Sequence, residues 1–183
     1  MITSFYFCTV FKRITIYGIA FGSLSAAMLL VQYFNGLYKT RSFVASLPVI
    51  FNLLIPAIGV YLFVKSLMSV KFDKPINMGK ALFGSLVVSL LVALCNIAAF
   101  RHIYSNEPGI MKEYRALQYA SIEKYVNSDN SVAVAEKPKA IKEKIDNFEN
   151  NFSVSSFGVN QIWMCLSTGM VVALLVFVRN HRM

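Results

Sequence analysis

The chain has 183 residues, of which 56% are hydrophobic and only 15% are charged, and its formal net charge is +9 at pH 7. This composition excludes an ordinary soluble domain. It also excludes a nucleic-acid-binding protein, because the basic residues lie beside long apolar stretches, where Lys and Arg set topology and meet lipid head groups. The cysteines, Cys8, Cys95 and Cys165, form no Cys-x-x-Cys pair, so we expect neither a metal site nor a cofactor.

Four apolar stretches, each without a charged residue, predict four transmembrane helices. They are Ile14–Tyr38, Ser42–Val64, Ala81–Phe100 and Phe157–Val178. A hydrocarbon core about 30 Å thick needs roughly 20 apolar residues, and all four stretches reach that length. The sequence therefore predicts an all-α polytopic membrane protein. Residues 1–100 hold the N-terminal segment and three spans, residues 101–156 lie outside the membrane, and residues 157–183 hold the last span and a basic tail.

The distribution of basic residues predicts the orientation in the membrane. With four spans, both termini and the connection 65–80 lie on one side. That side carries Lys12, Arg13, Lys65, Lys71, Lys74, Lys80, Arg179 and Arg182. The other side carries Lys39, Arg41 and the long third connection, in which basic and acidic side chains are equal in number. By the positive-inside rule, we expect both termini in the cytoplasm and the third connection outside the cytoplasmic membrane.

The third connection predicts an amphipathic helical hairpin. Apolar residues recur at three- and four-residue steps from Ile110 to Tyr125, which is typical of a helix with one buried face. Asn127–Ser131 then favours a turn, and Glu136 with Pro138 is typical of the start of a second helix.

The apolar stripe of this hairpin is a candidate partner-binding surface. It consists of Tyr114, Leu117, Ile122, Tyr125, Ile141, Ile145, Phe148 and Phe152. A unit this small buries too little apolar surface alone. The stripe therefore needs cover from the ends of the spans, the membrane interface or the helices of a partner. The balanced charge of the hairpin disfavours binding to an anionic lipid surface.

The polar residues inside the spans are amides and hydroxyls. No Asp, Glu, Lys, Arg or His lies within a span, which disfavours a proton-coupled transporter. In the predicted orientation the amides lie in the outer half of the spans: Gln32, Asn52, Asn96, Asn160 and Gln161. They either join neighbouring helices by hydrogen bonds or form a site for a small polar ligand.

Small residues recur every four positions along two of the spans. Gly18, Gly22 and Ala26 follow this spacing in the first span, and Ser85, Ser89 and Ala93 follow it in the third. Such faces let helices approach closely. The pattern leaves open whether they pack within one bundle or between two copies of the chain.

No set of residues has the pattern of a catalytic site. His102 and His181 lie at opposite faces of the membrane, and the hydroxyls within the spans have no neighbouring base. There is no Gly-x-Ser-x-Gly, glycine-rich phosphate loop or His-Glu-x-x-His. We therefore expect no catalytic residue and no enzymatic activity.

Three features of the sequence are similar to those of one family of membrane proteins. The segment Pro75–Gly84 looks like that family's loop, in which a small-basic-Ala step leads into the third span. The segment Tyr104–Pro108 is similar to its aromatic-then-Asn-x-Pro exit, and charged amphipathic helices then precede a last span that ends in basic residues. In these features the chain resembles the four-span bacterial membrane proteins of domain of unknown function 4199. The resemblance implies a bacterial inner-membrane protein with this fold, and it implies no function.

The expected function is that of a small interaction or structural subunit of a larger envelope assembly. Its hairpin or the surfaces of its spans would bind a membrane-protein partner or a second copy of the chain. The competing interpretation is a small-solute transporter or channel that uses the outer amides.

Overall fold

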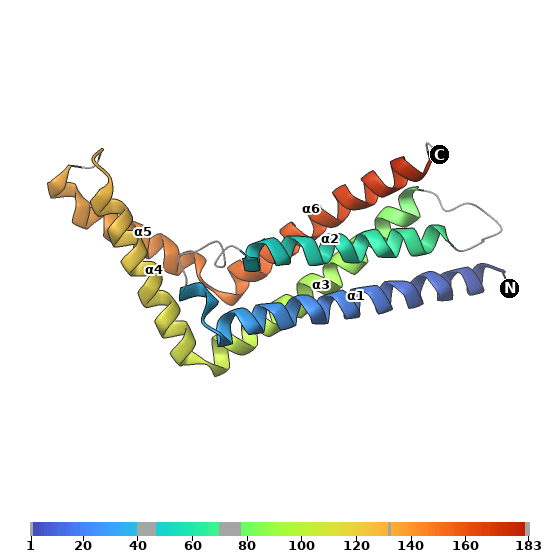
Figure 1. Ribbon diagram of the computed structural model, residues 1–183, viewed down its shortest axis with the longest axis horizontal. Helices are drawn as coiled ribbons and strands as arrows, with labels where there is room; N and C mark the ends of the chain where they lie inside the picture. Colours follow the sequence, from blue (N-terminus) through green and yellow to red (C-terminus); the bar gives the residue numbers. More distant parts are fainter. Residues whose placement is uncertain (1, 40–46, 70–77, 132, 182–183) are drawn as a thin grey trace.

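A computed structural model of the chain describes residues 2–39, 47–69, 78–131 and 133–181. Within these ranges the chain forms six α-helices and no strand. They are α1 (Ile2–Phe34), α2 (Leu47–Met68), α3 (Met78–Asn106), α4 (Pro108–Ser128), α5 (Lys137–Asn151) and α6 (Val154–His181), with short 3-10 helices η1 (Leu37–Lys39) and η3 (Val134–Glu136). Helices α1, α2, α3 and α6 are long and apolar enough to cross a membrane. Figure 1 shows them as a bundle with the α4–α5 hairpin at one end and both termini at the other. The predicted all-α, four-span fold with a hairpin before the last span is confirmed.

The helices extend beyond the apolar stretches that predict them. Helix α1 begins at Ile2, and α3 continues past Phe100 to Asn106. A charge-free stretch indicates only the segment of a helix that lies within the hydrocarbon core. The helix itself can continue into water, because its backbone hydrogen bonds form there as well. Helix α1 also ends earlier than the predicted span, because Gly36 adopts a left-handed conformation with φ of +62°. Residues 42–46 of the second predicted span and 75–77 of the family-like loop lie outside the described residues.

Helix α3 lies at the centre of the bundle, since it contacts α1, α2, α4 and α6. Its buried side includes Ser85, Val88, Ser89, Val92, Asn96, Phe100 and Ile103. Towards the end that carries the termini, the core consists of Ile14, Val60, Phe63, Val64, Leu67, Val88, Ala173 and Val176. Near the hairpin, it consists of Leu29, Tyr33, Phe100, Ile103 and Met111. The first turn of α4, through Met111, is thus part of the core.

The small residues of α1 are used for packing within the molecule. Gly18 lies against Leu91 of α3, and a Cβ atom at Gly22 would lie 2.7 Å from Sγ of Cys95. On the α6 side of α3, Gly169 lies against Ser89. The structure therefore assigns the glycines of α1 to the close approach of α1 and α3 in one bundle.

Local sequence sets the ends of the two hairpin helices. Pro108 is the first residue of α4, where a missing N–H breaks no helical hydrogen bond. At the tip, Oδ1 of Asp129 accepts hydrogen bonds from the N–H of Ser131 at 2.9 Å and from its hydroxyl at 2.6 Å. These bonds lower the pKa of the Asp129 carboxyl below its ordinary value. The predicted break between the helices lies at Asp129–Ser131, because α4 continues through Asn127 and Ser128, and the helix start near Pro138 is confirmed.

Candidate functional site at the base of the hairpin

Aromatic rings from five helices meet where the hairpin joins the spans. They are Tyr33 from α1, Phe100 and Tyr104 from α3, Tyr114 from α4, Phe148 from α5, Phe152 directly after α5, and Phe157 from α6. Phe100 stacks on Phe157 with ring centroids 4.1 Å apart. Phe152 stacks against Tyr114 at 5.2 Å and against Phe148 at 5.0 Å. Such pairs add about 0.5–1.5 kcal/mol each beyond the area that they bury, so this aromatic base cluster fixes α4 and α5 to the spans.

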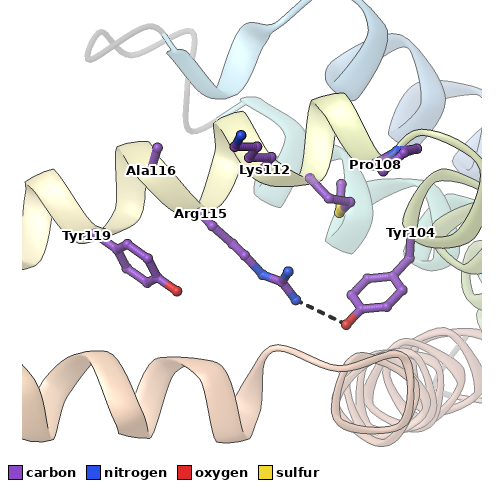
Figure 2. A pocket seen from close by; sticks show the side chains of 7 residues that line it. Tyr104, Pro108, Lys112, Arg115, Ala116 and Tyr119 are labelled. Atoms are coloured by element: carbon purple, nitrogen blue, oxygen red, sulfur yellow. Dashed lines mark hydrogen bonds between the residues drawn. The ribbon is translucent and has the colours of Figure 1, made fainter.

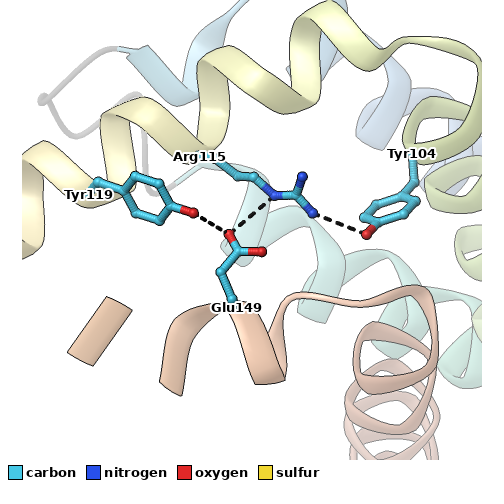
Figure 3. Close-up of polar contacts among 4 residues, drawn as sticks. All are labelled: Tyr104, Arg115, Tyr119 and Glu149. Atoms are coloured by element: carbon cyan, nitrogen blue, oxygen red, sulfur yellow. Dashed lines mark hydrogen bonds and ion pairs between the residues drawn. The ribbon is translucent and has the colours of Figure 1, made fainter. Parts of the chain in front are cut away.

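A polar network around Arg115 joins α3, α4 and α5 beside the aromatic base cluster. Nη2 of Arg115 donates to the hydroxyl of Tyr104 at 3.1 Å, and its Nε lies 3.2 Å from Oε1 of Glu149. The hydroxyl of Tyr119 donates to the same Glu149 oxygen at 2.6 Å, as Figure 3 shows. The Arg115 and Glu149 side chains are 32% and 35% exposed. An ion pair so open to solvent adds about 1 kcal/mol or less, so the main effect of this Arg115 network is to orient its side chains.

Both tyrosines of α4 at this site are held in the neutral form. The hydrogen bond to the Glu149 carboxylate raises the pKa of the Tyr119 phenol above its ordinary value. Burial in the aromatic base cluster raises the pKa of Tyr114. At neutral pH both phenols therefore keep their protons, and Tyr119 is a hydrogen-bond donor to Glu149.

A second ion pair holds the hairpin from the side of α1. Nζ of Lys39, at the end of η1, lies 2.6 Å from Oε1 of Glu113 on α4. This contact places the turn after α1 on the same side of the bundle as the hairpin. The base of the hairpin is thus attached through η1, through the aromatic base cluster and through the Arg115 network.

A groove of about 380 Å³ opens between the end of α3 and one face of α4, as Figure 2 shows. It is lined by Tyr104, Pro108, Met111, Lys112, Arg115, Ala116 and Tyr119. Arg115 extends from α4 towards Tyr104 of α3, so that the Arg115 network forms part of its wall. The groove combines two cations and two phenols with apolar walls, which is a lining suited to an anionic group attached to an apolar body.

The sequence pattern alone does not single out the groove. Lys112 and Arg115 occupy the polar positions that any amphipathic helix has, and Tyr104 belongs to another helix. One available signal is the spacing of Pro108, Lys112, Arg115 and Tyr119, which places them on one face of α4. The juxtaposition with Tyr104 depends on the angle at which α4 leaves α3 at Pro108.

The structure divides the predicted partner-binding stripe into an inner and an outer part. Tyr114, Phe148 and Phe152 belong to the aromatic base cluster: Tyr114 and Phe152 pack against the ends of the spans, and Phe148 packs against Phe152. The others lie further out: Ile122, Ile141 and Ile145 are half-buried, and Leu117 and Tyr125 are exposed. One face of the Tyr125 ring is covered by Lys144, whose Nζ lies 4.2 Å from the ring centroid.

The five predicted span amides differ in burial. Asn96 and Gln161 are buried, Gln32 and Asn52 are half-buried, and Asn160 is exposed. The contacts of α3 with Gly158 and Gly169 of α6 place Asn96 and Gln161 in the same layer of the bundle. Gln161 donates a long hydrogen bond to Sγ of Cys165 at 3.7 Å. Both polar atoms of the Asn96 side chain lack a hydrogen-bond partner among the described residues.

The residues that build this site lie within one continuous match to a protein family. Residues 16–177 match the family model described as protein of unknown function (DUF4199). No curated protein and no solved structure matches the chain. Among the residues that the structure describes, no group of three or more His, Cys, Asp or Glu side chains could hold a metal ion. Because the match extends from the first span to the last and includes the hairpin, this chain belongs to the DUF4199 family.

Proposed function

We propose that the protein is a small interaction subunit of a larger membrane assembly, and that the outer half of its hairpin binds a helix of a partner membrane protein. The observation that carries this proposal is the division of the hairpin into an attached base and a projecting arm. The base, up to Tyr119, is joined to the spans by the aromatic base cluster and the Arg115 network. Beyond Tyr119, α4 continues to Ser128, roughly 14 Å further at 1.5 Å per residue, away from the bundle (Figure 1).

The projecting arm, residues 120–145, carries apolar side chains that its own helices leave uncovered. Tyr125 is 60% exposed and Val134 is 84% exposed. Charged side chains of both signs surround them, and the charge of the whole connection is balanced. Exposed apolar residues within a polar rim are typical of protein interfaces. A balanced charge favours a protein surface over an anionic bilayer, so these features support a protein partner.

The proposed location is the inner membrane of a bacterium, with both termini in the cytoplasm and the hairpin outside. The bundle end opposite the hairpin carries both termini (Figure 1). Basic residues concentrate towards that end, among them Lys12, Lys65, Lys80 and Arg179. This asymmetry supports the proposed orientation through the positive-inside rule. The proposed role requires no catalytic residue and no cofactor.

Photo-crosslinking in native membranes tests the proposed partner surface. A photoreactive amino acid replaces Tyr125 on the apolar face of the arm, and a control replaces Glu123, an exposed residue of the same helix. We expect one discrete adduct with a different protein from position 125 and none from position 123. The absence of an adduct at both positions, together with a monomeric particle after mild purification, would contradict the proposal. An adduct of two copies of the 20.5 kDa chain would reassign the surface to self-association.

The second candidate function is a small-solute transporter or channel, and the unpartnered, buried Asn96 side chain favours it. A solute that enters the bundle at this layer would supply the missing hydrogen bonds. In that case Asn96→Leu abolishes a solute-dependent phenotype at unchanged expression, while Asn160→Leu on the exposed side of α6 does not. If Asn96→Leu cells retain the phenotype, the amide serves packing, and the transporter candidate is excluded.

A further inference from the structure

The groove beside Tyr104 lies just beyond the charge-free part of α3. The charge-free stretch of α3 ends at Phe100, and Tyr104 is about one helical turn further, roughly 6 Å along the axis. The head-group layer of a bilayer is roughly 5–8 Å thick on each side of the hydrocarbon core. Tyr is enriched at this level because its ring is apolar and its hydroxyl is polar. The groove is therefore positioned to meet the polar parts of lipids.

The groove has an excess of positive charge and free donors. Lys112 and Arg115 are three residues apart on one face of α4. Arg115 directs its Nε to Glu149 and its Nη2 to Tyr104, and a guanidinium has five N–H donors, so others remain available. Lys112 is exposed and has no ion-pair partner in the part of the chain that the structure describes. Glu149 forms an ion pair with Arg115 and accepts a hydrogen bond from Tyr119, and Glu113, the residue after Lys112, pairs with Lys39.

The hydroxyl of Tyr104 adds a neutral donor to the two cations. Its oxygen accepts the hydrogen bond from Arg115, so the phenolic proton is free to be donated to a third group. The rest of the wall is apolar and includes Pro108 and Met111. A volume of about 380 Å³ lies within the range of small-molecule sites.

We propose that this groove binds the phosphate of an anionic phospholipid, with Lys112 and Arg115 as its cationic ligands and the Tyr104 hydroxyl as a neutral donor. Guanidinium and ammonium groups are the usual protein partners of phosphate oxygens. The apolar wall accommodates the glycerol and the first acyl carbons, which a free phosphate ion lacks. The balanced charge of the hairpin as a whole does not oppose this site, because the two cations are concentrated at its base.

The test measures lipid retention by the full-length protein. The protein is reconstituted in phosphatidylcholine nanodiscs that contain increasing fractions of phosphatidylglycerol. After the protein is released from the nanodiscs, native mass spectrometry counts the lipids that it retains. Lys112→Gln is compared with Lys124→Gln, which removes another exposed Lys of the same helix. We expect wild type and Lys124→Gln to retain phosphatidylglycerol preferentially. Lys112→Gln should require about five- to tenfold more of that lipid for the same occupancy.

Tyr104→Phe is the second variant, because it keeps the ring in the aromatic base cluster and removes only the hydroxyl. We expect it to weaken retention less than Lys112→Gln does. Equal retention of phosphatidylglycerol by wild type and both variants would overturn the proposal, as would equal retention of the two lipids by the wild type. Titration of glycerol phosphate into phosphatidylcholine nanodiscs tests whether the groove binds a soluble phosphate ester rather than a lipid. If the soluble ester binds and phosphatidylglycerol does not compete with it, the lipid assignment is wrong.

Discussion

Glu149 makes two contacts at the base of the hairpin: it accepts a hydrogen bond from the Tyr119 hydroxyl at 2.6 Å, and it forms an ion pair with Arg115, whose Nε lies 3.2 Å away. Because the neutral phenol makes the first contact, the pKa of Tyr119 is raised above its ordinary value of about 10. The stabilisation from this bond is therefore complete below pH about 10 and disappears as the pH rises through the raised pKa. The Tyr119–Glu149 link is thus present throughout the physiological range.

The corresponding prediction concerns the ionisation of a single tyrosine. The tyrosinate absorbance of the wild type minus that of Tyr119→Phe isolates the titration of Tyr119. We expect a midpoint above the ordinary value in the wild type and a lower midpoint in Glu149→Gln, which retains an acceptor oxygen and loses the negative charge. An unchanged midpoint in Glu149→Gln would show that Glu149 does not hold this phenol.

At the scale of the helix, the close approach of α1 and α3 depends on Gly18. A Cβ atom at this position would lie 2.9 Å from Cβ of Leu91, an atom that cannot move without the backbone. We expect Gly18→Ala to destabilise the protein by about 1–3 kcal/mol through overpacking, although Ala is the better helix former. The matched control is Gly109→Ala in α4, where nothing lies within 4 Å. Thermal unfolding in detergent micelles should give shifts of opposite sign, and a Gly18→Ala protein as stable as the wild type would contradict this packing.

The helices themselves were predictable from short-range patterns. A charge-free stretch of about 20 residues has few alternatives to a span, because hydrocarbon leaves every unpaired backbone group unsatisfied. The hairpin was predictable because periodic apolar residues are interrupted at Asn127–Ser131 and resume after Pro138. The helix ends were less well predicted. The continuation of α3 to Asn106 and the stop of α1 before Gly36 depend on backbone conformation, which composition does not record.

The groove at the base of the hairpin was not predictable from these patterns. Periodicity indicates which face of α4 is apolar, but it does not indicate which part of that face the spans cover. That division depends on the change of direction between α3 and α4 at Pro108. It also depends on the contact of Phe152, after α5, with Phe100 of the bundle. Tyr104 and Arg115 come together for the same reason, across the junction of two helices. A prediction of the site would have required the angle between α3 and α4.

At the scale of the whole molecule, the two ends of the bundle differ in chemistry. One end carries both termini, and the other carries the hairpin with its aromatic base cluster and the Lys39–Glu113 ion pair (Figure 1). The attachment of the turn after α1 to α4 fixes these two segments on the same side. The structure therefore limits the orientation to two alternatives, hairpin outside or hairpin inside, and the choice between them depends on the charges.

Reporter fusions distinguish the two orientations. The excess of Lys and Arg at the end that carries the termini predicts that this end stays in the cytoplasm, because translocating several basic residues across a polarised membrane is unfavourable. A green fluorescent protein fused after Met183 should fluoresce, and alkaline phosphatase inserted at Asn130, in the exposed hairpin tip, should be active. The reciprocal fusions serve as controls and should both be silent. The reverse pattern would place the hairpin and its groove in the cytoplasm. The phosphate chemistry proposed for Lys112 and Arg115 would then apply to the lipids of the inner leaflet.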